Sequence, residues 1–543
     1  MVKALKDLCL SCVMNNLEKF PKLQSQLPSK YKELLIERLA DHDLFTPHYV
    51  PHIINNIFSA NLRTIVLYEC QQITDDILIK LSRSQCKLEV LKIHGCHSLT
   101  DSGIEAITTN QDELESLELR RLTKISSNSL RKIKSEKLWR VDLKGCSSIK
   151  TEGIDILTKN NRNIKVLILG NKTGVDISVY QHVAENLQHS LEEFNAYLHA
   201  TTSECLYHLS EYCSNLKKLN LEGCTLIDKD GLIKLFQGCT KLVDLDLSYC
   251  NKLRDYPDNE AFWILPQGLT DLTLCGVMLE NETIFVECLQ RLPKLRSIHL
   301  CGVTALNDNT LTQILEKIGK DLTTLDVSGY GGFTKNLTDA GIKSVSKYCY
   351  SLQNLKISLL ADVTCITLLP LLKDRQRACQ IQKLSINCKL TTLDVLYQVA
   401  RSCENLLKYD LGGVSGVTND IIFLLVTTCT KLTHISLKGC RLITDCALIE
   451  LARCCPLKSL VLSGINNLTD ASIFALANSC HQLEEIYLNG CSHVSSVAVH
   501  YLIDCCIKRL YVQHATPNAQ PYQLMAKNLD TGEFCRADLL QVS

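Results

Sequence analysis

An apolar pattern that recurs about every 26 residues constrains this chain more than any other feature of its sequence. Each recurrence has the form L-x-x-L-x-L, often with a cysteine three residues later. The first residues of the successive units are Leu62, Leu88, Leu114, Leu138, Ile164, Leu191, Leu216, Leu242, Leu269, Leu295, Leu322, Leu352, Ile381, Leu406, Leu432, Leu457, Leu483 and Ile507. One such unit cannot bury its apolar face alone, so neighbouring units must stack and share a continuous core.

Each unit is predicted to contain a short strand followed by a helix. The L-x-x-L-x-L run partly alternates between apolar and polar residues, which is typical of a strand with one buried face. Ile77, Leu78 and Leu81 then follow the three-to-four spacing of a helix. The intervening turn contains threonine and aspartate that we expect to cap the helix, as at 73–75, 99–101, 443–445 and 468–470. The chain is therefore predicted to be an α/β solenoid.

Most of the 29 cysteines fall into two columns of the repeat. One column follows the strand and the other precedes it; the members are Cys70, Cys96, Cys146, Cys224, Cys250, Cys440 and Cys491, and Cys213, Cys239, Cys349, Cys403, Cys429 and Cys480. Thiols that fill small gaps between stacked turns explain this placement. A zinc site needs paired ligands such as two C-x-x-C units, and this chain has one, at Cys9 and Cys12. We therefore expect no metal and no cofactor. Cys275 and Cys301 depart from the columns and are expected on the exposed strand face.

These repeats resemble the cysteine-containing leucine-rich repeats of F-box leucine-rich-repeat proteins and of the antagonist-of-mitotic-exit-network family. The resemblance covers about residues 60–513. It implies a horseshoe solenoid of about 18 repeats, with strands on the concave side and helices on the convex side. We divide the chain into a helical N-terminal cap at 1–59, the solenoid at 60–513 and a closing segment at 514–543.

The composition and the absence of several motifs exclude other functional classes. Lys plus Arg and Asp plus Glu number 58 each, so the basic excess of a dedicated nucleic-acid binder is missing. No run reaches the ~18 uninterrupted apolar residues of a membrane-spanning helix, and the N-terminus lacks the pattern of a secretory signal peptide. No glycine-rich phosphate loop, H-E-x-x-H or G-x-S-x-G motif occurs. We expect a non-catalytic protein of the cytoplasm, the nucleus or both, with no membrane or nucleic-acid partner and with its cysteines as thiols.

A candidate docking helix lies in the first fifteen residues. Ala4 and Leu5, then Cys9 and Val13, resemble the BC-box, a helical motif that docks on elongin C. Residues at i, i+4 and i+8 form a narrow apolar ridge that can lie in the groove of a partner. The resemblance implies that Leu5, Cys9 and Val13 contact elongin C.

A second short motif follows this helix. Leu27, Pro28 and Tyr31 fit the hydrophobic-P-x-x-hydrophobic pattern and resemble a cullin-2 box. The two motifs together imply elongin B/C and cullin-2 as partners. The resulting interpretation is a substrate-recognition subunit of a cullin–RING ubiquitin ligase, which binds target proteins on its repeats while its partners supply the chemistry.

Two alternatives remain open for the N-terminal segment. Leu27 and Pro28, the 33–35 segment and Leu39 roughly follow the opening of an F-box, which would imply the SCF adaptor and cullin-1. Its spacing is about one residue too long, and neither Trp139 nor Trp263 lies near residue 60, where that family usually has a tryptophan. The other alternative is a plain cap on a protein-binding scaffold unrelated to ubiquitin.

The inner strand face is expected to vary in charge along the array. The second, fourth and sixth residues after each lead residue should face the concave side. In the units led by Leu191 to Leu322 they include Glu193, Glu222, Asp244, Asp246, Asp271 and Asp326, against Lys218. In the units led by Ile381 to Leu432 they include Lys383, Lys408 and Lys438, against Asp410. We hypothesise that the acidic stretch binds a basic protein substrate by charge complementarity; the alternative is a solvated face with uneven charges.

Overall fold

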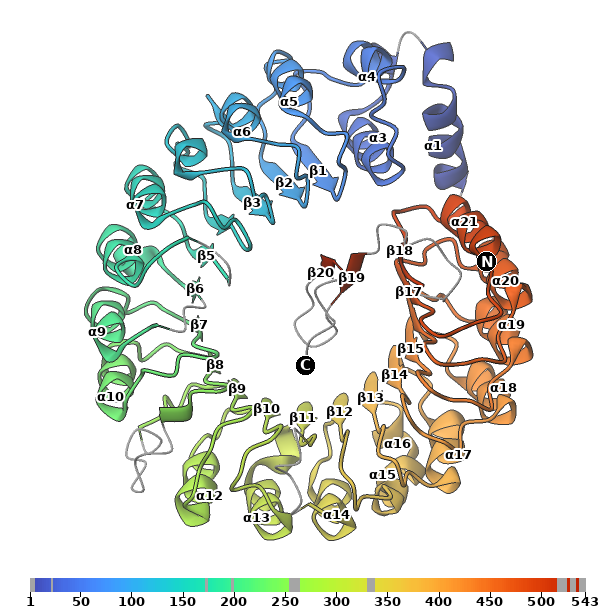
Figure 1. Cartoon of the computed structure of the whole chain (residues 1–543). Coiled ribbons are helices and arrows are strands. Elements are labelled where there is room, and N and C mark those ends of the chain that lie inside the picture. Colours follow the sequence, from blue (N-terminus) through green and yellow to red (C-terminus); the bar gives the residue numbers. More distant parts are fainter. Residues whose placement is uncertain are drawn as a thin grey trace. The chain divides into compact units, whose positions relative to one another are not determined.

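The chain folds into two compact units, Ala4–Lys294 and Leu295–Ser543 (Figure 1). The computed structural model describes residues 5–20, 23–170, 174–196, 200–252, 264–329, 337–514, 525–527 and 534–536. In each unit, strands line the inner side of a curved array and helices cover its outer side (Figure 1). We refer to them as the amino-terminal and the carboxy-terminal unit.

The amino-terminal unit contains the cap and nine parallel strands in its described residues. The cap helices are α1 (Leu5–Asn15), η1 (Leu17–Lys19), α2 (Leu23–Gln26), α3 (Ser29–Asp41) and α4 (Val50–Asn56). The strands are β1 (Thr64–Tyr68), β2 (Val90–His94), β3 (Ser116–Arg120), β4 (Arg140–Asp142), β5 (Val166–Ile168), β6 (Glu193–Asn195), β7 (Lys218–Asn220), β8 (Asp244–Asp246) and β9 (Asp271–Thr273). The repeat helices are α5 (Asp75–Ser82), α6 (Asp101–Thr108), η2 (Ser127–Leu130), α7 (Thr151–Asn160), α8 (Val179–Leu187), η3 (Gln188–Ser190), α9 (Ser203–Tyr212), α10 (Lys229–Gly238) and α12 (Glu282–Gln290).

The carboxy-terminal unit repeats the same alternation of strand and helix. Its parallel strands are β10 (Ser297–His299), β11 (Thr324–Asp326), β12 (Asn354–Lys356), β13 (Lys383–Ser385), β14 (Lys408–Asp410), β15 (His434–Ser436), β16 (Ser459–Val461), β17 (Glu485–Tyr487) and β18 (Tyr511–Gln513). Its helices are α13 (Asp308–Ile318), η5 (Gly319–Asp321), α14 (Asp339–Tyr348), η6 (Ile366–Leu368), α15 (Leu369–Lys373), α16 (Arg375–Ala378), α17 (Leu393–Ser402), α18 (Asn419–Thr428), α19 (Asp445–Cys454), α20 (Asp470–Ser479) and α21 (Ser496–Cys505). The predicted solenoid of about 18 strand–helix repeats is confirmed.

The repeat lead residues form the core that the sequence predicted. From Leu62 to Leu483, every lead residue is at most 2% exposed. The last unit differs, because the pairing of β17 with β18 places Arg509, and not Ile507, in the lead register. Ile507 was therefore assigned two residues too early; the apolar residues that this unit buries are Leu510 and Val512.

A cap carboxylate ends the parallel sheet of the amino-terminal unit. In the repeats, a backbone carbonyl of the preceding strand region accepts two N–H groups; the Arg63 carbonyl, for example, accepts those of Glu89 and Val90. At the first strand, Glu33 Oε1 of α3 accepts the N–H groups of Arg63 (2.7 Å) and Thr64 (3.1 Å) instead. The side chain thus satisfies donors that a preceding repeat would otherwise satisfy.

The threonine and aspartate of the turns act differently from each other. Thr100 and Thr469 accept the N–H two residues later and so cap their helices as predicted, whereas Thr74 and Thr444 make no such bond. The aspartate instead links successive repeats, since Asp75 accepts both the N–H (2.9 Å) and the hydroxyl (2.5 Å) of Thr100. Asp101, Asp308, Asp339, Asp445 and Asp470 make the same pair of bonds.

The column cysteines are buried thiols, and several of them donate to backbone carbonyls of the preceding repeat. The Sγ of Cys146 lies 2.9 Å from the Leu119 carbonyl, and that of Cys429 lies 3.1 Å from the Cys403 carbonyl. Burial raises the pKa of Cys146 to about 12, so this thiol stays protonated at neutral pH. Among the described residues, no group of three or more His, Cys, Asp or Glu side chains is placed to hold a metal ion.

The segment predicted to close the array from residue 514 lies mostly outside the described residues. Its described parts, β19 (Met525–Lys527) and β20 (Phe534–Arg536), pair antiparallel. Within the described ranges, no helix combines the length and apolar character that crossing a membrane requires.

Candidate protein-docking site

Helix α1 presents an apolar ridge to solvent. Leu5 is 77% exposed and Leu8 is 47% exposed, while Cys9 and Cys12 are also exposed and Val13 is half-buried. At about 100° per residue, these five side chains occupy one contiguous face of the helix. The structure therefore places the three predicted elongin-contacting residues together, with Leu8 and Cys12 beside them. Ala4, the small residue of the motif, lies outside the described residues.

A buried ion pair fixes which face of α1 points outward. Asp7 forms an ion pair with Arg38 of α3, and Arg38 Nη1 also donates to the Asp7 carbonyl at 3.2 Å. The two side chains are 16% and 9% exposed. Leu10 and Met14, on the same side of α1 as Asp7, are buried. The contact with α3 therefore leaves the Leu5–Cys9–Val13 side uncovered.

The predicted cullin-contacting residues lie on the surface at the start of α3. Pro28 precedes the first residue of the helix and is exposed, Tyr31 is 37% exposed, and Leu27 is half-buried. The adjacent Lys32 is buried, and its Nζ donates to the Gln24 carbonyl (2.7 Å) and Ser59 Oγ (3.1 Å). Burial lowers the pKa of Lys32. These bonds fix the turn that displays Pro28 and Tyr31.

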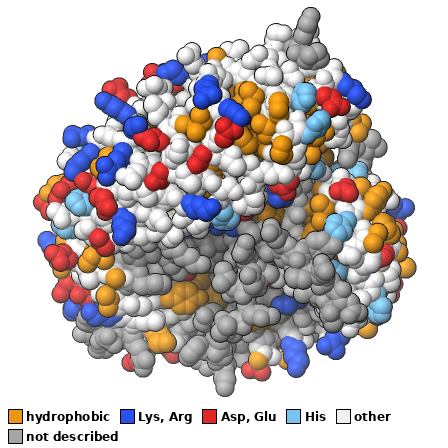
Figure 2. All heavy atoms as spheres, turned by 45° about the horizontal axis from the view of Figure 1, so that its top comes forward, with side chains coloured by type: hydrophobic (Ala, Val, Ile, Leu, Met, Phe, Trp, Pro, Cys, Tyr) orange, Lys and Arg blue, Asp and Glu red, His pale blue; other side chains and the backbone are white. Residues whose placement is uncertain are grey.

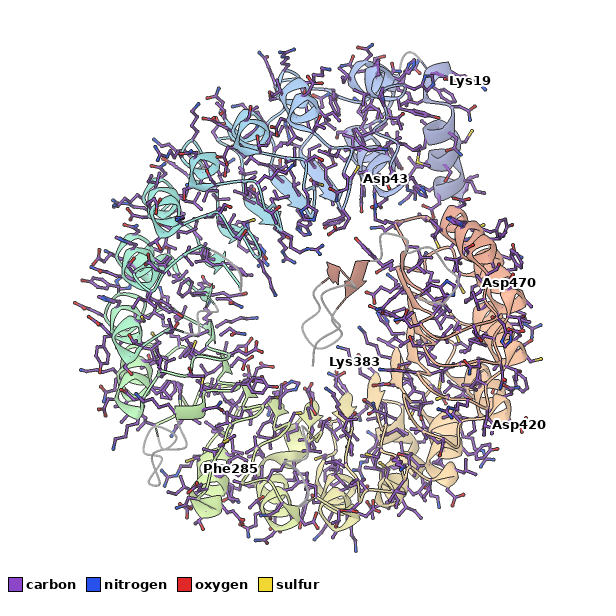
Figure 3. The ribbon with its side chains drawn as sticks, viewed as in Figure 1. Lys19, Asp43, Phe285, Lys383, Asp420 and Asp470 are labelled. Carbon is purple, nitrogen blue, oxygen red and sulfur yellow. The ribbon has the colours of Figure 1, made fainter. Side chains whose placement is uncertain are left out.

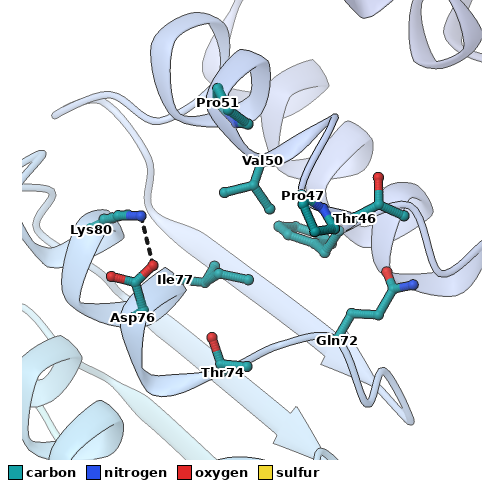
Figure 4. A pocket seen from close by; sticks show the side chains of 10 residues that line it. Thr46, Pro47, Val50, Pro51, Gln72, Thr74, Asp76, Ile77 and Lys80 are labelled. Atoms are coloured by element: carbon teal, nitrogen blue, oxygen red, sulfur yellow. Dashed lines mark ion pairs between the residues drawn. The ribbon is translucent and has the colours of Figure 1, made fainter.

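A shallow pocket of about 480 Å³ lies where α4 meets α5 (Figure 4). Phe45, Pro47, Val50, Pro51 and Ile77 supply its apolar lining. An ion pair between Asp76 and Lys80 at 2.6 Å stands at its edge. Apolar side chains also gather in patches between charged ones on the face shown in Figure 2. None of the predicted site residues lines the pocket.

The predicted acidic stretch comes together on β6–β9 of the amino-terminal unit. The parallel register places Glu193, Lys218, Asp244 and Asp271 at successive paired positions across four strands. Asp246 lies two residues beyond Asp244 on the same half-buried face. Burial and the like charge of Asp271 raise the pKa of Asp244, although Lys218 lowers it from 3.8 Å away. The two carboxylates of Asp244 and Asp271 therefore occupy paired positions on neighbouring strands, with Lys218 on the other side of Asp244.

The other predicted substrate residues occupy different surroundings. Glu222 is half-buried two residues after β7, and its N–H donates to Asn220 Oδ1 at 2.9 Å. Asp326 belongs to the carboxy-terminal unit and is 5% exposed. It lies 3.7 Å from His299 and 3.4 Å from Lys356. Asp326 is thus much less accessible than the acidic residues of β8 and β9, because neighbouring strands bury it and Lys356 pairs with it.

Asp326 also differs from the acidic stretch in its titration. Burial would raise its pKa, but the hydrogen bond from His299 and the charge of Lys356 lower it below the ordinary value. In contrast to Asp326, two lysines of this unit are exposed. Lys383 and Lys408 occupy opposite positions in the register of β13 and β14. Figure 3 shows Lys383 on the inner, strand-lined side and Asp420 and Asp470 among the outer helices.

Sequence reasoning missed a charged network on β2–β4. Glu118 is 5% exposed, and its carboxylate lies 2.9 Å from Lys92 Nζ, 3.3 Å from His94 Nε2, 3.7 Å from Arg120 Nη2 and 3.6 Å from Arg140 Nε. Burial alone would raise its pKa, but hydrogen bonds from His94 and Lys92 and the charges of Lys92 and Arg120 lower it to about 2. The sequence pattern that could have revealed this network is the alternation of positive and negative residues at the inward positions of three successive units.

Two further ion pairs extend this network. Asp142 Oδ2 accepts hydrogen bonds from both Nε (2.9 Å) and Nη2 (2.5 Å) of Arg120. Glu69 forms an ion pair with Arg121, two repeats away. Both carboxylates are almost completely buried. The network therefore holds several cations in defined positions on the inner face.

One family model matches a single stretch of the repeat array, and several solved structures are partly similar to the chain. Residues 212–236 match a family model described as a leucine-rich repeat. Similar solved structures include a chain of the yeast Rad7–Elc1 complex (15% identity, 92% of this chain and 96% of that chain, TM-score 0.38). A chain of the TLR13–ssRNA13 complex (16%, 84% and 72%, 0.40) and the leucine-rich-repeat-containing protein LegL7 from Legionella pneumophila (16%, 61% and 93%, 0.32) are also similar. With the strands and helices described above, the chain is a leucine-rich-repeat solenoid.

Proposed function

We propose that this chain is a non-catalytic substrate receptor that joins a target protein to an elongin B/C–cullin-2 ubiquitin ligase. The observation that carries the proposal is the solvent-facing apolar ridge of α1. Leu5, Cys9 and Val13 have the spacing of a helix that lies in a partner groove, and α3 leaves them uncovered. A contiguous patch of exposed apolar side chains, and not a single exposed one, marks an interaction surface.

The second contact would be the turn before α3. Pro28 and Tyr31 are exposed at the start of α3, the helix against which α1 packs through the Asp7–Arg38 pair. A partner on the α1 ridge and a second partner on this turn would therefore occupy neighbouring parts of the cap. The inner face would then bind the target protein, with the acidic residues of β8 and β9 selecting a basic segment.

Co-purification tests the ligase assignment. The full chain is mixed with elongin B/C or with the SCF adaptor, and size-exclusion chromatography shows which one co-elutes. We expect elongin B/C to co-elute and the combined Leu5→Ser and Cys9→Asp variant to lose this binding by tenfold or more, since two of the three motif residues of the ridge become polar. The matched control is Leu442→Ser with Val497→Ser, which alters two apolar side chains that are 55% and 71% exposed on the carboxy-terminal unit.

The same experiment separates the alternatives. Co-elution with the SCF adaptor alone would favour an F-box-type receptor with cullin-1. Co-elution with neither adaptor would contradict both ligase assignments and leave a protein-binding scaffold unrelated to ubiquitin. In the substrate arm, reversing Asp244 and Asp246 to lysine should abolish capture of a hexalysine peptide, and unchanged capture would contradict the role of the acidic stretch.

A further inference from the structure

The network on β2–β4 presents positive charge at the inner surface of the amino-terminal unit. Its three carboxylates are no more than 7% exposed: Glu69, Glu118 and Asp142. Its four cations are 25% to 35% exposed: Lys92, Arg120, Arg121 and Arg140. We call these four residues the inner cationic patch. His94 adds no positive charge at neutral pH, because burial lowers its pKa.

The buried carboxylates hold the cations in place before any ligand arrives. Arg120 is fixed through two nitrogens on Asp142, and Lys92 through a 2.9 Å contact with Glu118. Side chains that are already ordered lose less conformational entropy on binding. The planar guanidinium groups of Arg120 and Arg140 are partly exposed, and the fork geometry of a guanidinium matches a carboxylate.

The backbone at this site adopts a conformation that its side chains disfavour. The seventh position after the lead residue has a positive φ angle, and glycine occupies it in many repeats. Glu69 (φ 53°) and Arg121 (φ 52°) take its place in two repeats and bind each other across Gly95. A Cβ at Gly95 would meet the carboxylate of Glu69, so a larger residue there would displace that carboxylate from its place beside Arg121.

We propose that the inner cationic patch binds the carboxylates of an acidic segment in a partner polypeptide. The network contains four partly exposed cations and three buried carboxylates, so its accessible surface is positive. A positive surface favours a ligand with negative charge. The same unit presents Asp244 and Asp271 on β8 and β9. A polypeptide along the inner face thus meets positive charge on β2–β4 and negative charge on β8–β9. The proposal does not depend on cullin or elongin binding.

Fluorescence anisotropy with a labelled hexaglutamate peptide tests this assignment on the purified full chain. We expect binding at low ionic strength that weakens as salt is added. Combined Lys92→Gln and Arg140→Gln should weaken binding about tenfold, since two partly exposed charges are lost. The matched control, Lys132→Gln with Lys159→Gln, removes the same charge from ion pairs with Glu105 and Asp155, residues of the outer helices, and should change binding less than about twofold.

A measurement on the unaltered protein keeps the test independent of variant folding. Hexaglutamate should slow amide hydrogen exchange in β2–β4 and leave the exchange of β8 and β9 unchanged. Absence of hexaglutamate binding at low salt, or equal loss in the control variant, would overturn the proposal. Binding of a phosphoserine peptide of equal charge without binding of hexaglutamate would overturn the carboxylate assignment in favour of phosphate. Elongin co-elution does not enter any of these outcomes.

Discussion

Replacing Glu118 with glutamine removes the charge at the centre of the β2–β4 network while keeping its shape. The environment lowers the pKa of Glu118 from 4.5 to about 2, which corresponds to roughly 3 kcal/mol of folded-state stability at neutral pH. The side chain is 7% exposed, so solvent screening reduces this figure little. Because the folded pKa is depressed, the stabilisation is complete above pH 4.5 and is lost as the pH falls through about 2.

Hydrogen exchange of the β2–β4 amides measures this effect locally, which suits a repeat protein whose segments open separately. At pH 7 the Glu118→Gln protein should exchange roughly a hundredfold faster than the wild type, because the opening free energy falls by roughly 3 kcal/mol. Comparing the variant with the wild type at the same pH cancels the intrinsic exchange rate. The ratio of their exchange rates should fall towards one as the pH approaches 2. The exposed Glu136→Gln is the control and should change nothing. An equal difference at pH 3 and pH 7 would refute the reasoning, since the loss would then come from packing and not from charge.

Three further predictions concern the cap, the repeat links and the buried thiols. Glu33→Ala leaves the N–H groups of Arg63 and Thr64 without their carboxylate acceptor and should destabilise the start of the sheet by about 2 kcal/mol, seen as faster exchange of these two amides; unchanged exchange would argue against the cap role. Asp75→Ala removes two bonds to Thr100 and should lower the free energy of unfolding of the amino-terminal unit by about 1–2 kcal/mol in urea titration, and an unchanged midpoint would contradict the link. Cys146, with a pKa of about 12, should resist maleimide at pH 8 in the folded chain and react only after unfolding; labelling of the native protein would contradict its burial.

Much of the fold follows from local sequence patterns. The lead leucines predicted the strand positions because each one must be buried between neighbouring units, and the register of hydrogen bonds agrees through Leu483. The pattern failed at Ile507, where an apolar residue fits the spacing but the pairing with β17 sets a register two residues later. It also missed the link made by Asp75, because that bond joins residues 25 positions apart.

The candidate site could be predicted only in part. Helical spacing grouped Leu5, Cys9 and Val13, but their exposure depends on the ion pair between Asp7 and Arg38, which the spacing does not reveal. Sequence position also placed Asp326 with the acidic residues, although it is buried and Lys356 of the next strand pairs with it. The network on β2–β4 was missed because a count of charged residues does not show which carboxylates are buried and which cations are exposed.

Thiol footprinting of α1 tests the proposed docking surface most directly. Cys9 and Cys12 are exposed on the ridge, and Cys446 is exposed on α19 as an internal reference. The free chain should alkylate at all three positions. With saturating elongin B/C, Cys9 and Cys12 should become protected while Cys446 reacts as before. A complex that forms while Cys9 and Cys12 still react at the free rate would contradict docking through this helix, as would failure to form a complex at all.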